Sequence, residues 1–266
     1  MSDLIKIPAG RAMLARLVRK AGDVLRIDDA VELLELDRIE ASKLMARWAK
    51  QGWLKRIAAG VYLPVPIDAL ESEHVLDDPW ILVPALFSPA YISGFSAAEY
   101  WDLTEQIFRD VVVMTASPLR SRKRTIHGVS FLLRGMDEEN FFGTRNIWRG
   151  QNKVLIANLH RTIIDMLAEP KLGGGIQHVS DCFAQYLERE DRDDELLVDY
   201  ARKLNNGAII KRLGFLAERS EAAQLVNLCN AGLSAGNVKL DPGLKCPRLV
   251  TRWKLFVPET WAEKRS

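Results

Sequence analysis

Residues 37–64 read D-R-I-E-A-S-K-L-M-A-R-W-A-K-Q-G-W-L-K-R-I-A-A-G-V-Y-L-P, and this stretch decides the fold of the first part of the chain. Asp37 and Glu40 have the spacing of a capping box, which predicts that a helix starts at this point and ends at Gly52. Two β-prone runs follow, and Gly60 between them suits the positive φ of a tight turn. The stretch therefore predicts a helix followed directly by a hairpin.

The predicted helix has an apolar side and a cationic side. At about 100° per residue, Ala41, Leu44, Met45 and Trp48 share one face, while basic and small residues occupy the other. Residues 41–67 contain no Asp or Glu. A polyanion is the expected partner, because each Lys or Arg placed against a phosphate releases condensed counterions.

In a helix-turn-helix arrangement this helix would enter the major groove of DNA, which is about 12 Å wide. Ser42, Lys43 and Arg47 are the predicted base-reading residues. The predicted phosphate contacts, which fix register without specifying sequence, are Arg38, Lys50, Lys55 and Arg56.

Two shorter segments with helical periodicity, residues 10–20 and 28–36, precede the capped helix. Three helices followed by a basic hairpin predict a winged helix-turn-helix domain over residues 1–66. Residues 67–79 are rich in Asp and Glu and are interpreted as an acidic linker. Residues 80–266 are predicted to form a larger domain.

The larger domain is predicted to be α+β, because early strands are followed by a run of helices rather than alternating with them. The expected strands are residues 111–114, 130–134, 153–157 and 250–256. The expected helices are residues 158–168, 177–188, 195–204, 208–218 and 221–229. Ser96 and Glu99 in S-A-A-E are interpreted as a second capping box.

Composition restricts the function classes. Hydrophobic residues make up 48% of the 266 residues and charged residues 27%, which is ordinary for a globular protein. Residues 1–66 hold 12 Lys and Arg against 8 Asp and Glu, whereas residues 67–266 hold 25 against 27, so the positive charge is local. No run approaches the length of about 18 apolar residues that spans a bilayer, and we expect a cytoplasmic protein.

Neither a metal nor a cofactor is expected. The three cysteines are widely spaced and form no C-x-x-C pair, so the sequence predicts reduced thiols rather than a disulfide framework or a zinc site. His127, His160 and His178 also lack the spacing of metal ligands.

A second basic cluster, consisting of Arg120, Arg122, Lys123 and Arg124, is expected in a loop between two strands. Such a loop is either simply solvated, or it supplies an additional phosphate contact, or it is a docking surface for an acidic partner.

Four segments carry a resemblance to a known family. They are Y-I-S-G-F-S-A-A-E-Y-W-D-L-T at residues 91–104, L-H-R-T-I-I-D-M-L at 159–167, R-L-G-F-L-A-E at 212–218 and R-W-K-L at 252–255. In order and spacing, together with G-V-Y at residues 60–62, they resemble the AbiEi-type antitoxins of bacterial type IV toxin–antitoxin systems, over nearly the whole chain.

The resemblance implies a repressor of its own operon that binds inverted repeats in double-stranded operator DNA. It also implies that the C-terminal domain counteracts an AbiEii-type nucleotidyltransferase toxin, without requiring a stable complex. The acidic segment before Trp80 and the basic residues 120–124 depart from the usual family pattern.

Three hypotheses follow, of which a DNA-binding antitoxin without enzymatic activity leads. The alternatives are a plain transcriptional regulator with a ligand-sensing C-terminal domain, and an enzyme, most plausibly a nuclease, tethered to DNA. A nucleotidyltransferase gene beside this one separates the first two hypotheses.

Overall fold

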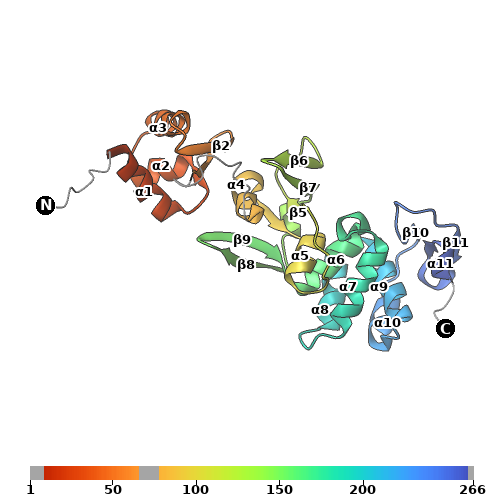
Figure 1. Cartoon of the computed structure of the whole chain (residues 1–266). Helices are drawn as coiled ribbons and strands as arrows, with labels where there is room; N and C mark the ends of the chain where they lie inside the picture. Colours follow the sequence, from red (N-terminus) through yellow and green to blue (C-terminus); the bar gives the residue numbers. More distant parts are fainter. Residues whose placement is uncertain (1–8, 66–77, 263–266) are drawn as a thin grey trace.

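The computed structural model describes residues 9–65 and 78–262, and its architecture is mixed α+β, as predicted (Figure 1). We call residues 9–65 the N-terminal unit and residues 78–262 the C-terminal unit. In Figure 1 the N-terminal unit lies at one end of the molecule, a sheet lies in the middle and most of the helices lie at the other end.

The N-terminal unit contains three helices and a small sheet. Its helices are α1 (Ala9–Ala21), α2 (Ile27–Leu34) and α3 (Arg38–Lys50). Its strands are β1 (Leu25–Arg26), β2 (Leu54–Ala58) and β3 (Val61–Pro64), in the order β1-β3-β2. The helices and the hairpin expected from the sequence are confirmed, and Gly60 has a φ of +74° at the turn.

Apolar side chains spaced along the three helices meet in one cluster, which explains why these short helices are stable together. Leu17 of α1, Met45 and Trp48 of α3, and Leu25 of β1 are fully or almost fully buried there. Most helical stability in proteins comes from such packing of an amphipathic face. The opposite side of α3 is thereby turned to solvent.

The C-terminal unit is built on a six-stranded sheet in the order β6-β7-β5-β4-β9-β8. The strands are β4 (Ala90–Ile92), β5 (Asp110–Thr115), β6 (Lys123–Ile126), β7 (Val129–Gly135), β8 (Thr144–Arg149) and β9 (Asn152–Ala157). The pairs β5·β7 and β4·β9 are parallel and the other three are antiparallel. This mixed pattern agrees with the α+β prediction.

Helices cover the sheet and continue beyond it. They are α4 (Val83–Phe87), α5 (Gly94–Tyr100), α6 (Leu159–Ala168), α7 (Ile176–Leu187), α8 (Asp194–Lys203), α9 (Gly207–Arg219), α10 (Ala223–Asn230) and α11 (Glu259–Ala262). The C-terminal unit also contains four short 3-10 turns, namely Pro79–Leu82, Glu138–Asn140, Pro170–Gly173 and Thr251–Trp253. The helices predicted from residue 158 onward are all present.

Three expectations about the C-terminal unit are wrong, the third in part. Ser96 does not cap α5, because the helix begins earlier, after Ser93, and the Ser96 hydroxyl instead accepts the backbone N–H of Val112 at 3.0 Å. The strand expected at residues 250–256 is divided into β11 (Arg248–Val250) and β12 (Leu255–Val257), because Lys254 adopts a left-handed conformation with φ +50°. These strands form a second sheet with β10 (Val238–Lys239).

The third expectation, a loop at residues 120–124, holds for residues 120–122 and is wrong for Lys123 and Arg124. Lys123 and Arg124 lie in β6, paired with Leu132 and Phe131 of β7. The cluster therefore reaches the edge of the sheet, where charged side chains protect an unpaired strand edge.

The two units share a hydrophobic cluster. Val24 and Val61 of the N-terminal unit are buried in the same cluster as Trp80 and Val154 of the C-terminal unit. The expected acidic linker falls mostly on residues 66–77, outside the described residues, and its last part, Asp78, caps the turn that begins at Pro79. The sheet thus packs directly against the N-terminal unit.

Within residues 9–65 and 78–262, no helix is long and apolar enough to cross a membrane. The three cysteines are free thiols, and two of them are buried.

Candidate nucleic-acid interface

The start of α3 is fixed by its own sequence. The Asp37 carboxylate accepts the backbone N–H groups of Ile39 at 2.7 Å and Glu40 at 2.8 Å, which satisfies two of the otherwise unpaired donors at a helix start. Because Trp48 and Met45 anchor the other side in the core, the outer side of α3 has a fixed orientation.

The outer side of α3 carries a continuous stripe. At helical spacing it consists of Ile39, Ser42, Lys43, Ala46, Arg47 and Lys50. Ser42 is half-buried and the other members are exposed. In the part of the chain that the structure describes, the cations Lys43, Arg47 and Lys50 form no ion pair and no side-chain hydrogen bond. Their positive charge is available to an external anion.

Ile39 is the residue of this stripe that sequence reasoning missed. Its side chain is 67% exposed although it is large and apolar. Its position three residues before Ser42 was the available signal, since that spacing puts both on one face. An exposed apolar side chain next to cations is suited to contact with a thymine methyl group.

Arg38 is engaged within the N-terminal unit. Its guanidinium forms an ion pair with Asp28 of α2, and both side chains are largely exposed. An exposed pair of this kind contributes about 0–1 kcal/mol, so a phosphate can compete with Asp28 for Arg38.

Lys55 and Arg56 of β2 do not lie on one surface, because neighbouring residues of a strand point to opposite faces. Arg56 is exposed, and its Nε donates to the carbonyl oxygen of Ala58 at 3.3 Å. Lys55 is half-buried and is paired across the hairpin with Leu63, which packs against the cluster between the two units. Arg56 is thus the more accessible hairpin cation.

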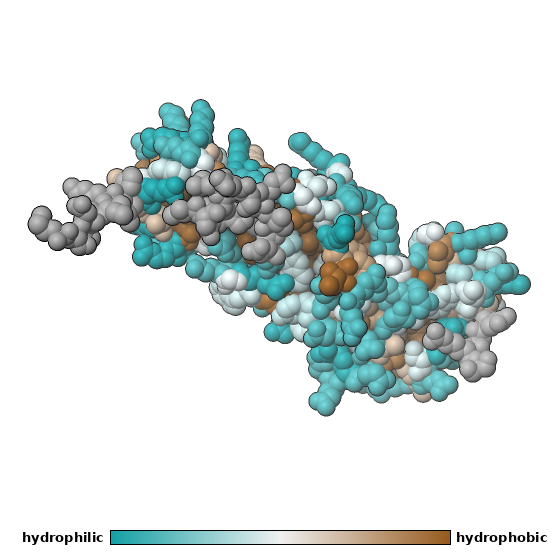
Figure 2. Space-filling model, viewed as in Figure 1, coloured by the Kyte–Doolittle hydropathy of each residue, from teal (hydrophilic) through white to brown (hydrophobic). Residues whose placement is uncertain are grey.

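The second basic cluster lies at and just before the start of β6, a strand whose other end contacts the hairpin. At the β6–β7 turn the Nε2 atom of His127 lies 3.4 Å from the carbonyl oxygen of Arg56, so β6 ends beside β2. Figure 1 shows α3, β2 and β6 along the same side of the molecule, and Figure 2 shows hydrophilic side chains projecting from that side. Arg120 and Arg122 are exposed, whereas Lys123 is paired with Asp110 at 3.4 Å.

The segments that resemble the antitoxin family lie in the C-terminal unit. Two of them, residues 91–104 and 159–167, meet in a buried polar network. Asp165 of α6 accepts hydrogen bonds from Arg161 Nε at 2.8 Å, Ser93 Oγ at 2.7 Å and Tyr91 Oη at 3.0 Å. Arg161 is 0% and Asp165 1% exposed, and Arg161 also lies over the ring of Phe142 at 4.4 Å. Burial raises the pKa of the Tyr91 hydroxyl well above its ordinary value of 10.0, with the Asp165 charge acting in the same direction.

The other two segments also meet. The Trp253 indole donates to Glu218 at 2.5 Å, and Arg252 pairs with the same carboxylate. Arg212 binds the last carbonyl groups of α6, at 2.7 Å from the oxygen of Leu167. These residues hold helices and strands of the C-terminal unit together.

No described residues form a metal centre: residues 9–65 and 78–262 contain no group of three or more His, Cys, Asp or Glu placed to hold an ion. His178, whose spacing gave no metal signal, lies against Gly173 and Thr104, with its Nδ1 2.6 Å from the Gly173 carbonyl oxygen.

Comparison with known proteins identifies a similar fold. No protein-family model and no curated protein matches the sequence. Among solved structures, the chain is similar to the RV2827C protein from Mycobacterium tuberculosis, with 13% sequence identity and a TM-score of 0.60 over 95% of this chain and 92% of that one. Nearly the full length of both chains therefore shares one mixed α+β architecture.

Proposed function

We propose that the protein is a DNA-binding repressor whose N-terminal unit acts as a winged helix-turn-helix domain. The observation that carries this proposal is the stripe on α3, which is rigidly anchored, cationic and free of acidic partners. An α-helix about 10–12 Å in diameter fits a major groove of about 12 Å. A protein of this kind acts on DNA in the cytoplasm.

In this proposal α3 lies in the major groove of double-stranded operator DNA. Ser42, Lys43 and Arg47 read base edges, and Ile39 contacts a thymine methyl group. Phosphates are bound by Lys50 and by the remaining predicted contacts, which are Arg38, Lys55 and Arg56. Ala46, as a small residue in the centre of the stripe, lets the helix backbone approach the bases.

The test starts from an unknown operator, so the full chain is used to select duplexes from a random library. The affinity of Arg47→Ala for the selected duplex is then measured, with Arg19→Ala on α1 as the control, because Arg19 is exposed but lies outside the stripe. Loss of a bidentate base contact weakens specific binding by about 1–3 kcal/mol. Equal affinities of the two variants, or no enriched sequence, would refute the proposal.

Salt dependence separates base reading from phosphate contact. Lys50→Ala is expected to weaken specific and nonspecific duplexes alike and to lower the slope of log affinity against log salt by about one. Arg47→Ala is expected to weaken binding to the specific duplex more than binding to the nonspecific duplex. If neither variant changes the slope or the specificity ratio, α3 is not the DNA-binding helix.

We further propose that the C-terminal unit provides antitoxin function against an AbiEii-type nucleotidyltransferase and has no enzymatic activity of its own. The support is the family resemblance. Its four segments contact one another in two pairs, within the buried network and at Glu218, as described above. Because those residues are structural, they do not locate the antitoxic surface.

The antitoxin proposal is tested by co-expressing the full chain with the product of a neighbouring nucleotidyltransferase gene. Wild type and Arg47→Ala are both expected to relieve toxicity, while only wild type represses the operon. A nuclease alternative requires cleavage of DNA in the presence of a divalent metal, which the proposal does not expect. Toxicity unrelieved by wild type would refute the antitoxin assignment.

A plain regulator with a ligand-sensing C-terminal unit is the second candidate. It is favoured by a cavity of about 1000 Å³ in that unit. Absence of any nucleotidyltransferase gene beside this one would select it over the antitoxin.

A further inference from the structure

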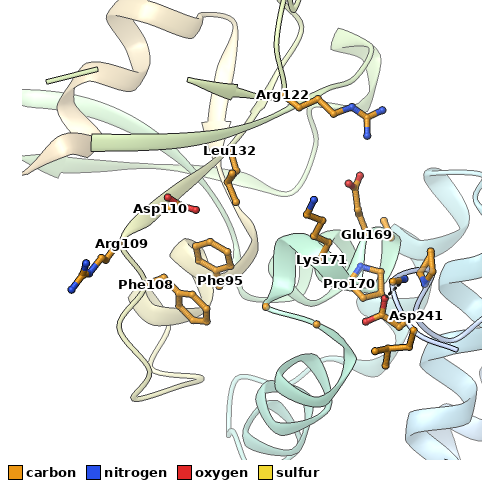
Figure 3. A pocket seen from close by; sticks show the side chains of 16 residues that line it. Phe95, Phe108, Arg109, Asp110, Arg122, Leu132, Glu169, Pro170, Lys171 and Asp241 are labelled. Atoms are coloured by element: carbon orange, nitrogen blue, oxygen red, sulfur yellow. Dashed lines mark hydrogen bonds between the residues drawn. The ribbon is translucent and has the colours of Figure 1, made fainter. Parts of the chain in front are cut away.

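The cavity lies in the C-terminal unit between the sheet and the helices (Figure 3). Strands β5 and β7 contribute Asp110 and Leu132 on one side, and Arg122, just before β6, lies at the rim. The turn before α7 contributes Lys171 on the other side. Its volume of about 1000 Å³ is at the upper end of the range for small-molecule sites, which is about 300–1000 Å³.

Two of the three carboxylates of the cavity are paired with cations. Asp110 pairs with Lys123 at 3.4 Å, and Glu169 pairs with Arg134 at 3.1 Å. The third carboxylate, Asp241, accepts the backbone N–H groups of Ile176 at 3.0 Å and Gly243 at 2.8 Å.

The cations of the cavity are not neutralised in this way. Arg109, Arg122 and Lys171 line it without an ion pair to any residue that the structure describes. In Figure 3 the Lys171 side chain extends from its turn into the space below β7, and Arg122 reaches over the same space from the strands. Three lining cations without an ion pair stand against one such carboxylate, Asp241, so the cavity has a surplus of positive charge.

An apolar wall faces these cations. The rings of Phe95 and Phe108 are stacked, with centroids 4.0 Å apart and an angle of 15° between their planes. Leu132 is half-buried beside them, and Leu244 is 44% exposed at the opposite rim. A mostly apolar lining with a few convergent charged groups is typical of a small-molecule site.

We propose that this cavity binds a small organic anion with an apolar ring, such as an aromatic carboxylate. The anionic group pairs with Lys171 and Arg122, and the ring packs against Phe108 and Leu132. Charge-assisted hydrogen bonds to a carboxylate are stronger than neutral ones and orient the ligand. This inference does not depend on DNA binding by α3.

Binding is tested with the fluorescent aromatic anion anilinonaphthalene sulfonate and the full chain. The variant is Lys171→Met, which removes the charge and keeps an unbranched apolar side chain. The matched control is Lys153→Met, because Lys153 is also exposed but lies on β9 outside the cavity. We expect saturable binding that is roughly tenfold weaker in Lys171→Met and unchanged in the control.

Competition then tests the two halves of the ligand. Benzoate is expected to displace the probe, and its neutral analogue benzyl alcohol is expected to displace it far less. The proposal is overturned if Lys171→Met and Lys153→Met bind alike, or if benzyl alcohol competes as well as benzoate. An unchanged thermal midpoint for both variants ensures that a loss of affinity is not a loss of folding. Failure of the DNA-binding tests would leave these outcomes unaffected.

Discussion

Replacing Asp165 by Asn tests whether the buried network holds α6 against the sheet. The substitution keeps the shape of the side chain and removes its charge. Arg161, which is 0% exposed, would then keep a positive charge with no compensating anion. Removing one partner of a buried ion pair costs about 3–5 kcal/mol, because the remaining charge stays away from water.

The chain supplies a matched control for this change. Asp199 and Lys203 on α8 form a pair with the same i,i+4 spacing, at 2.8 Å, but their side chains are 48% and 55% exposed. Asp199→Asn is expected to cost at most about 0.5 kcal/mol, since exposed helical pairs contribute about that much. The difference between the two variants isolates the effect of burial.

Urea unfolding followed by circular dichroism measures both variants. With a slope of about 3 kcal/mol per molar urea, Asp165→Asn is expected to lower the midpoint by roughly 1–2 M. Adding Arg161→Met to Asp165→Asn is expected to cost less than the sum of the two single changes, because the pair is lost only once. Equal midpoints for Asp165→Asn and Asp199→Asn would refute the role assigned to the network.

Three further outcomes are expected. Burial lowers the pKa of His160 below its usual 6.5 against the opposing effect of nearby aspartates, and its Nε2 accepts the Asp193 N–H at 3.1 Å. The unfolded chain therefore binds the proton more tightly, stability falls as the pH drops below about 6.5, and His160→Gln reduces that fall in acid unfolding curves. A Cβ on Gly214 would lie 2.0 Å from a ring carbon of Trp253, so Gly214→Ala is expected to lose at least about 1–3 kcal/mol in the same urea assay. A thiol reagent is expected to modify the half-buried Cys246 in the folded protein and to reach the other two thiols only after unfolding, because burial raises their pKa to about 12.

The helices of eight or more residues were predictable from sequence because their signals are local, whereas the short α4 and α11 were not predicted. Asp37 and Asn158 are side-chain caps, and helical periodicity marks the segments behind them. The edge strands β6 and β8 were not predicted, because their exposed charged residues hide the alternation that identifies a strand. The central strand β4 was missed for another reason, since its three residues are all buried and show no alternation.

The candidate site was predictable to a similar degree. Spacing along α3 placed Lys43, Arg47 and Lys50 on one exposed side, and the structure agrees. Sequence could not show that Arg38 is paired with Asp28, nor that Lys55 is half-buried, because both facts depend on contacts between separate elements. The cavity was equally inaccessible to sequence reasoning, since its lining comes from segments more than 130 residues apart.

The position of Val24 and Val61 in the hydrophobic cluster of the C-terminal unit has a mechanical consequence. Valine side chains shared by two units make a joint that resists rotation, since turning it would open voids in packed apolar surface. The direction in which α3 faces is consequently set by the sheet as well as by its own helices. A ligand bound to the sheet and a DNA duplex bound to α3 would therefore contact a single rigid body rather than two independently moving domains.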